Sequence, residues 1–273
     1  MRKSIYIVFV LAITACHSLP KEKFHQYSFH PSVDYEGDTL QIRLPNPLQC
    51  PLRIYLRSDA EILGDALEIA SPVLLEPMQD SLLNVILEDS IKGRINFTPR
   101  FGDIDRELGE TGFEYPFPRG MSYKIIQGNN TNHTHNTDWS RYALDFNLAV
   151  GDTICAADSG YVVGVIEDYS KGGEGNQWKP YGNFITLFHP HNGYFTQYVH
   201  LDFKGSMVEL GDWVDAGESI GISGMTGQTN IAHLHFNCLK PVDNDQGLMS
   251  SPYSFKDGRS SENFKAGDLV KRE

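Results

Sequence analysis

The sequence predicts an all-β protein, because short runs of alternating apolar and polar residues recur along it, separated by Pro and Gly. In the first half these runs indicate a small β-sandwich, interrupted by one short helix at 59–70. In the second half, further runs and the Asn192-Gly193 hairpin signal indicate an antiparallel sheet. The strand-like runs lie at residues 40–44, 52–56, 81–87, 94–98, 161–167, 183–189, 194–201 and 232–239.

Composition divides the chain into two parts. Residues 115–120, Tyr-Pro-Phe-Pro-Arg-Gly, are typical of a linker, and beyond them seven of the ten histidines fall between His133 and His235. We therefore expect an N-terminal β-sandwich-like domain at 33–118 and a second β domain at 119–273. The first of these shows no cluster of chemically reactive side chains, so the candidate site residues come from the second.

The first residues are typical of an export signal. Arg2 and Lys3 form a positive start, and the apolar run at 5–15 is about half the roughly 20 residues that span a bilayer. The run ends in Ile13-Thr14-Ala15-Cys16, which resembles the lipobox of bacterial lipoproteins, in which cleavage precedes a cysteine that is then acylated. The alternative is ordinary cleavage after Ala15, with Cys16 unmodified.

The lipoprotein interpretation assigns residues 1–15 to a signal peptide and residues 16–32, which are polar and aperiodic, to a tether. The protein would then be anchored in a membrane through acylated Cys16. Residue 17 is His rather than an acidic retention signal, so we expect a location at the outer membrane, facing the periplasm. Replacing Cys16 with Ala should move the protein from the membrane fraction to the soluble fraction.

Charge and cysteine content narrow the classes of function. The formal net charge is -12 and Lys and Arg do not cluster, so a nucleic-acid partner is excluded. If Cys16 is acylated, Cys50, Cys155 and Cys238 remain, and three cysteines cannot all pair with one another. Buried free thiols are the expectation, with a Cys155–Cys238 bond left open.

The tripeptide His233-Leu234-His235 is the most informative short motif. It lies in a strand-like run, where successive side chains face opposite ways, so both imidazoles share one face. Leu234 and Phe236 would then pack on the other face. Two adjacent imidazoles with apolar support can hold a metal ligand beside a proton-transfer group, although an isolated H-x-H is weak evidence for a site.

Other candidates are ambiguous when taken singly. Asp145 lies in a strand-like stretch and is equally consistent with a capping carboxylate, while His135, ten residues earlier, could be a solvated loop residue. His200 could be a core histidine with satisfied hydrogen bonds. His189 and His191 flank the hairpin turn, where we expect them in solvent.

Taken together, these residues match a known family in order and context. The segment from about residue 120 to 241, nearly half the chain, closely resembles the lysostaphin-type (LytM-type) zinc metallopeptidases, which hydrolyse bacterial peptidoglycan. The resembling stretches are Gln127-Gly with Thr134-His135, Tyr142-Ala-Leu-Asp145-Phe, Gly151-Asp-Thr-Ile-Cys-Ala-Ala-Asp-Ser-Gly160, Gln197-Tyr-Val-His200-Leu, Gly211-Asp-Trp-Val-Asp-Ala-Gly217, and Gly224-Met-Thr-Gly227 followed by His233-Leu-His235-Phe.

The resemblance implies an antiparallel β-sheet metallopeptidase domain with a zinc-containing groove and one Zn²⁺ per chain. It implies that His135, Asp145 and His235 bind the zinc and that His233 and His200 are the catalytic pair. Well-known members begin with a shorter H-x-x-x-D motif, so His133 remains an alternative first ligand, and alignment from Gln127-Gly favours His135. The implied substrate is the peptidoglycan stem peptide, and we expect a monomer.

The chemistry agrees with this resemblance. Two imidazoles and one carboxylate leave an open position on tetrahedral zinc, as in catalytic sites, and zinc lowers the pKa of a bound water to about 7. The sequence has no H-E-x-x-H motif, so a histidine must replace the glutamate base of those proteases. A histidine pKa of about 6.5 suits that task, with His233 as base and His200 as partner for the oxyanion or leaving amine.

Two other classes of protein remain possible. One is a lysostaphin-type domain without catalysis that regulates other wall hydrolases, although all five positions here hold a residue of the required type. The other is a carrier module, because 211–217 resembles the turn of biotinyl domains, but residues 223–227 lack the lysine such a module modifies. The sequence does not identify the peptide bond that is cleaved. The expected compartment favours a direct D-alanyl–diamino-acid cross-link over a glycine bridge.

Overall fold

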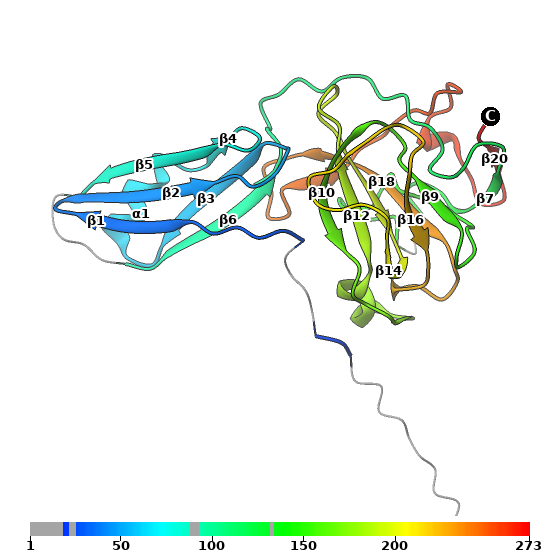
Figure 1. The fold of residues 1–273 in the computed structure, drawn as a ribbon, viewed down its shortest axis with the longest axis horizontal. Coiled ribbons are helices and arrows are strands. Elements are labelled where there is room, and N and C mark those ends of the chain that lie inside the picture. The colour runs from blue at the N-terminus through cyan, green and yellow to red at the C-terminus, as the bar shows by residue number, and fades with distance from the viewer. Residues whose placement is uncertain (1–18, 22–25, 88–92, 132–133) are drawn as a thin grey trace, which may run out of the picture.

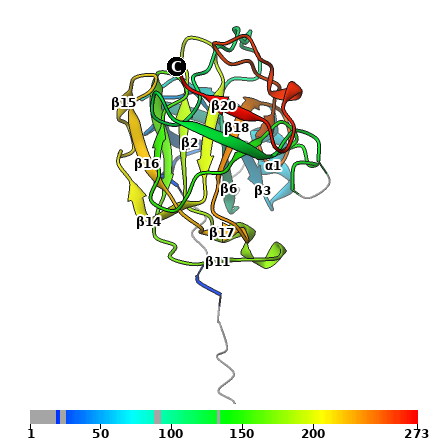
Figure 2. The ribbon, with the colours of Figure 1, turned by 90° about the vertical axis from the view of Figure 1, so that its right-hand side faces the viewer.

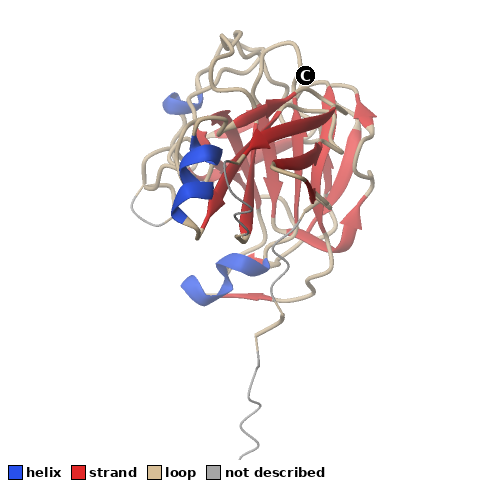
Figure 3. Ribbon diagram, turned by 90° about the vertical axis from the view of Figure 1, so that its left-hand side faces the viewer, coloured by secondary structure: helices blue, strands red, loops and turns tan. Residues whose placement is uncertain are grey.

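The computed structural model describes residues 19–21, 26–87, 93–131 and 134–273. The predicted signal peptide at 1–15, the predicted acylation site Cys16 and the alternative ligand His133 lie outside these residues. Within them the chain is nearly all β, as predicted, and the ladders between named strands are antiparallel apart from one short parallel pair. Figure 3 shows how little helix the fold contains. The described residues hold no helix with the length and apolar character needed to cross a membrane.

The N-terminal part consists of two three-stranded sheets, which lie on the left in Figure 1. One sheet has the order β1 (Ser32–Glu36), β2 (Thr39–Pro45) and β5 (Asp80–Ile86). The other has the order β4 (Val73–Leu75), β3 (Leu52–Ser58) and β6 (Ile95–Phe101). The α-helix α1 (Glu61–Glu68) falls within the predicted range. The alternating apolar residues of β2 and β3 are buried in one shared cluster, which confirms the period-two prediction.

The C-terminal part is built on a nine-stranded sheet. Its path is β15 (Trp213–Val214), β10 (Gly160–Ile166), β12 (Phe184–Phe188), β13 (Phe195–Val199), β18 (Leu234–Pro241), β8 (Leu144–Phe146), β7 (Ser122–Gln127) and β20 (Leu269–Lys271), and β19 (Leu248–Ser250) also pairs with β18.

Two smaller sheets complete the C-terminal part. One contains β14 (Leu201–Ser206), β16 (Ser219–Ser223) and β9 (Thr153–Cys155), and the other contains the parallel pair β11 (Gly172–Gly173) and β17 (Gly227–Gln228). The 3-10 helices are η1 (Asn176–Tyr181) and η2 (Ser261–Asn263). Figure 2 shows β11 and β17 below the larger sheets.

The nine-stranded sheet buries apolar residues on both faces. On β18, Leu234 and Phe236 point into the C-terminal core, whereas Leu239 packs in the cluster of the N-terminal sandwich. Phe195, opposite Leu239 in the register, packs in that same cluster. Residues of odd number on β18 therefore face the sandwich side, and His235 belongs to this set.

A buried arginine joins the two parts of the chain. The guanidinium of Arg53, on β3, donates to the backbone oxygens of Phe101 and Gly102 within the N-terminal part. It also donates to the oxygens of Val242 and Gly247, in the turn between β18 and β19, at 3.0 and 2.9 Å. Because these donors are satisfied by carbonyls on both sides, the sandwich is fixed against one end of β18.

Two sequence expectations are wrong. The first half of the predicted linker at 115–120 is packed, since Tyr115 and Phe117 are buried and their rings stack 5.7 Å apart, whereas Arg119 and Gly120 are exposed. His189 is buried rather than solvated, and its ring nitrogens lie 2.9 Å from the Ser159 oxygen and from Thr196 Oγ1. In both places tertiary packing overrides a local pattern that is common in exposed loops.

The burial of His189 should make the protein less stable in mild acid. Burial lowers the pKa of His189 to about 4, so below pH 6.5 the unfolded chain binds a proton that the folded chain does not. This contribution is complete above pH 6.5 and is lost as the pH falls towards 4, by about 3 kcal/mol over that range. Urea unfolding between pH 4 and 7 should therefore show a flatter pH dependence for His189→Gln than for the wild type.

The exposed His30 supplies the control for this measurement. His30→Gln should follow the wild-type pH dependence. An equally steep dependence in wild type and His189→Gln would contradict the assignment of the acid sensitivity to His189.

Candidate metal and catalytic site

The candidate residues come together through the register of three neighbouring strands. Asp145 on β8 lies directly opposite His235 on β18, and Val199 on β13 lies opposite His235 on its other side. His200 follows the last residue of β13, and His233 precedes the first residue of β18. Leu234 and Phe236 are fully buried in the core behind them, so both residues of the H-x-H motif face the same side, as expected.

Three side chains converge on one point. Nε2 of His135 lies 3.2 Å from Nδ1 of His235 and 3.2 Å from Oδ1 of Asp145, and the last two atoms are 2.9 Å apart. His135 is fully buried and Asp145 nearly so. Among the described residues, this is the group of His, Cys, Asp or Glu whose ligand atoms are close enough to hold one metal ion.

The loop after β7 delivers His135 to this point. The carboxamide of Gln127 contacts the hydroxyls of Thr131 and Thr134, which folds the loop back on the end of β7. Nδ1 of His135 lies 3.0 Å from the backbone oxygen of Gly128 and donates its proton to it. In the neutral ring Nε2 therefore carries a lone pair, directed at the cluster.

This arrangement fits a bound cation. With Nδ1 protonated, Nε2 of His135 and Oδ1 of Asp145 are two acceptors only 3.2 Å apart, in a site nearly closed to solvent. Burial lowers the pKa of His135, but the adjacent Asp145 carboxylate outweighs burial and raises it, so a proton is drawn to the position between the two. A divalent cation bound there would remove the same repulsion, and two nitrogens with one carboxylate oxygen suit zinc.

Asp145 stays ionised in this environment. Burial raises its pKa, but the neighbouring rings of His233 and His135 outweigh burial and hold it well below the ordinary range. Burial lowers the pKa of His235, so its ring is neutral near pH 7. An ionised carboxylate and a neutral imidazole are the states that bind metal.

A second pair of histidines lies against this cluster. The rings of His200 and His233 have centroids 4.5 Å apart, and Nε2 of His233 lies 3.7 Å from Oδ2 of Asp145. Nδ1 of His200 donates to the Thr226 oxygen at 2.7 Å, and Nδ1 of His233 donates to the Ile231 oxygen at 2.9 Å. Burial, aided by the neighbouring rings of His233 and His235, lowers the pKa of His200 to about 3.

The structure thus brings together all five residues named from the sequence. Their backbone partners, the oxygens of Gly128, Thr226 and Ile231, were not predicted. The glycines of the 224–227 loop indicated a turn in the sequence. The sequence did not predict that this loop would contact His200.

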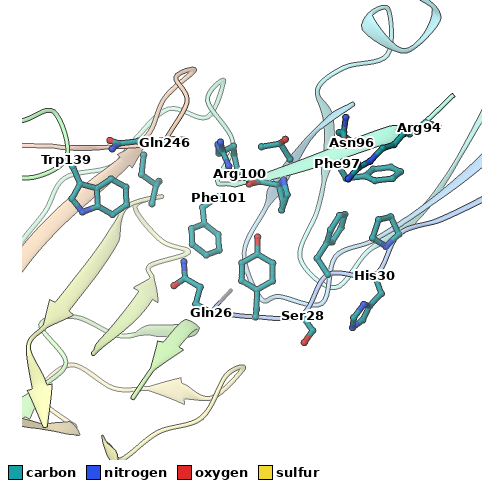
Figure 4. Close-up of a pocket in the computed structure, with 17 residues that line it drawn as sticks. Gln26, Ser28, His30, Arg94, Asn96, Phe97, Arg100, Phe101, Trp139 and Gln246 are labelled. Carbon is teal, nitrogen blue, oxygen red and sulfur yellow. Dashed lines mark hydrogen bonds between the residues drawn. The ribbon is translucent and has the colours of Figure 1, made fainter. Parts of the chain in front are cut away.

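A cavity of about 800 Å³ lies elsewhere, at the junction of the two parts of the chain (Figure 4). It is lined by residues 26–31, the strand β6 with Arg94, and Trp139 and Gln246 from the C-terminal part. None of the five candidate residues lines it. Its position therefore adds nothing to the chemistry of the metal cluster.

Comparison with known proteins identifies the C-terminal part. The family model of peptidase family M23 matches residues 140–247, which include four of the five candidate residues and begin just after His135. The peptidoglycan DD-endopeptidase ShyB of Vibrio cholerae is 28% identical over 169 residues, covering 55% of this chain and 36% of its own length. Lysostaphin of Staphylococcus staphylolyticus is 36% identical over 95 residues, covering 35% of this chain and 18% of its own length.

Among solved structures, the catalytic domain of lysostaphin from Staphylococcus simulans is 25% identical, with a TM-score of 0.34, and the match covers 48% of this chain and 87% of that one. The sequence matches to ShyB and lysostaphin span about a third or less of the length of those two relatives. Residues 140–247 therefore match peptidase family M23, and the similarity to lysostaphin supports a peptidase domain of the lysostaphin type (LytM-type) in this part of the chain.

Proposed function

We propose that this protein is a zinc metalloendopeptidase that hydrolyses the peptide cross-links of bacterial peptidoglycan. The observation that carries the proposal is the pair His200 and His233 lying against the His135, Asp145 and His235 cluster. Relatives named as peptidoglycan endopeptidases support the substrate class. We propose that residues 119–273 form the peptidase domain and residues 33–118 an accessory β domain.

We assign one zinc ion to His135, Asp145 and His235. When bound, zinc acts as a Lewis acid and lowers the pKa of a coordinated water to about 7. The other contributions come from the chain itself. The Gly128 oxygen keeps the Nε2 lone pair of His135 directed inward, and the strand register places Oδ1 of Asp145 2.9 Å from Nδ1 of His235, so both atoms face the same point.

His233 is the assigned general base. Its Nδ1 is held by the Ile231 oxygen, so Nε2 is a bare acceptor beside the cluster and can take a proton from the attacking water. The Asp145 carboxylate, 3.7 Å from that nitrogen, stabilises the imidazolium that results. The proton then lies close to the scissile bond, where the leaving amine requires it.

His200 is the assigned partner at the oxyanion or the leaving amine. Its depressed pKa keeps the ring neutral at pH 7, and its Nε2 is then an acceptor rather than a donor. His200 can therefore orient a substrate N–H group directly, but it must first gain a proton before it can donate to an oxyanion. Its ring lies against that of His233, with centroids 4.5 Å apart, so it can hold the leaving amine where the His233 imidazolium delivers its proton.

For the substrate, we propose direct D-alanyl–diamino-acid cross-links rather than glycine bridges, from the expected compartment of the protein. Purified protein should convert directly cross-linked muropeptide dimers to monomers, which mass spectrometry of the products would measure. Cleavage of pentaglycine without action on the dimers would overturn the choice of bond. Failure to cleave either substrate, with no zinc bound, would favour a regulatory domain without catalysis.

Substitution of the two histidines of the H-x-H motif should have different effects on zinc binding. His235→Ala removes one of three protein ligands and should strip the zinc. His233→Ala should keep close to one zinc per chain and still lose activity by about 10²–10⁴-fold, the usual contribution of positioned proton transfer. Zinc content by elemental analysis and the rate of muropeptide cleavage would be measured on both variants.

The exposed His191 supplies a matched control, since its side chain is 52% exposed and it lies on the turn between β12 and β13. His191→Ala should keep both zinc and activity. Thermal melts of all variants would show that each is folded. Equal loss of zinc in His233→Ala and His235→Ala, or an active His233→Ala, would contradict the roles assigned to them.

A further inference from the structure

The backbone at His200 has an unusual conformation. Its φ is 70°, in the left-handed region that non-glycine residues rarely adopt, at the junction of β13 and β14. Such a conformation persists only when the surrounding structure holds it, and it is often found at functional sites. Here it turns the His200 ring towards His233.

The loop at 224–227 is what holds His200. The Gly224 N–H donates to the His200 oxygen at 2.9 Å, and the Thr226 oxygen accepts the Nδ1–H of His200 at 2.7 Å. The loop therefore contacts both the backbone and the ring of this residue. No other hydrogen bond to the His200 ring is found among the described residues.

Two glycines let the loop come this close. A Cβ on Gly224 would lie 2.5 Å from the backbone of Asp202, closer than side chains pack. Gly227 has a φ of +79°, and a Cβ there would lie 2.6 Å from the Cα of Gly182. Glycine at both ends is thus required if the carbonyl between them is to reach His200.

The Thr226 side chain fixes the carbonyl in place. Its hydroxyl donates to the Leu201 oxygen at 2.7 Å and accepts the Asn183 N–H at 2.9 Å, so its donor and one acceptor are used. The residue is 3% exposed. Asn183, fully buried, is anchored in turn by its carboxamide, which bonds the backbone of Tyr169 and the Asp202 oxygen.

We propose that Thr226 is a positioning residue that sets the tautomer of His200. Its hydroxyl holds the Thr226 carbonyl against Nδ1, which keeps the proton on Nδ1 and leaves Nε2 bare towards His233. If this carbonyl moved, the proton could shift to Nε2 and the ring would face His233 with a donor instead of an acceptor. The catalytic consequence rests on the proposed peptidase function, whereas the tautomer does not depend on it.

The test compares Thr226→Val with Thr226→Ser in the full-length, zinc-loaded protein. Valine has nearly the shape of threonine and removes only the hydroxyl, whereas serine keeps it. The ¹⁵N shifts of the His200 ring, assigned by their absence in His200→Gln, report which nitrogen is protonated. In the wild type and Thr226→Ser, Nδ1 should be protonated and Nε2 bare, whereas Thr226→Val should lose this pattern.

Activity on muropeptide dimers gives a second readout. Thr226→Val should lower kcat by on the order of 10²-fold with KM changed less than about threefold, because proton transfer and not binding is impaired. Its zinc content should remain near one per chain, and Thr226→Ser should stay within about threefold of wild type. Thr98→Val, on β6 of the sandwich, is the control for the same substitution away from the site.

Several outcomes would overturn the proposal. These are a wild-type His200 protonated on Nε2, an unchanged tautomer in Thr226→Val, or an equal loss of activity in the serine and valine variants. If Thr226→Val does not fold, Thr226→Ala offers the same test without the added methyl group. A wild-type protein that shows the Nδ1–H tautomer but cleaves no peptide would refute the proposed function and leave the positioning role of Thr226 intact.

Discussion

The pairing of β18 with β8 on one side and with β13 on the other is the constraint on which the site depends. Directly opposed residues in antiparallel strands have Cβ atoms about 5 Å apart, so Asp145 and His235 meet without any contribution from loops. A slip of one residue would turn His235 into the core and Leu234 outward. The full burial of Leu234 and Phe236 opposes that slip, so the packing of the core also fixes the geometry of the candidate ligands.

Backbone carbonyl groups complete what the strands begin. Nδ1 of His135, His200 and His233 each donates to a main-chain oxygen, and their Nε2 atoms are left for the site. His235 is the exception, since its Nδ1 is the atom that faces Asp145. A main-chain acceptor has no pKa of its own in the relevant range, so these tautomers are maintained across the pH range in which the enzyme would work.

The sequence indicated the strands and the shared face of His233 and His235 because both follow from the period-two geometry of a strand. It could not indicate that Tyr115 and Phe117 are packed in the core, since prolines beside them are equally common in linkers. The sequence also could not predict which backbone carbonyl groups accept hydrogen bonds from the histidines. They lie in loops whose position depends on contacts between distant segments, such as Thr226 with Asn183, and local patterns do not encode these contacts.

The shared face of β18 has a consequence for the architecture as a whole. Leu239 and Phe195 lie under the N-terminal sandwich, and the Val242 and Gly247 oxygens are satisfied by Arg53. A C-terminal half produced alone would present these apolar side chains and two unpaired carbonyls to water, on the same sheet face that carries the histidines. Such a fragment would tend to self-associate through the face that carries the candidate site, so the sandwich acts as an intramolecular solubility partner for the C-terminal part.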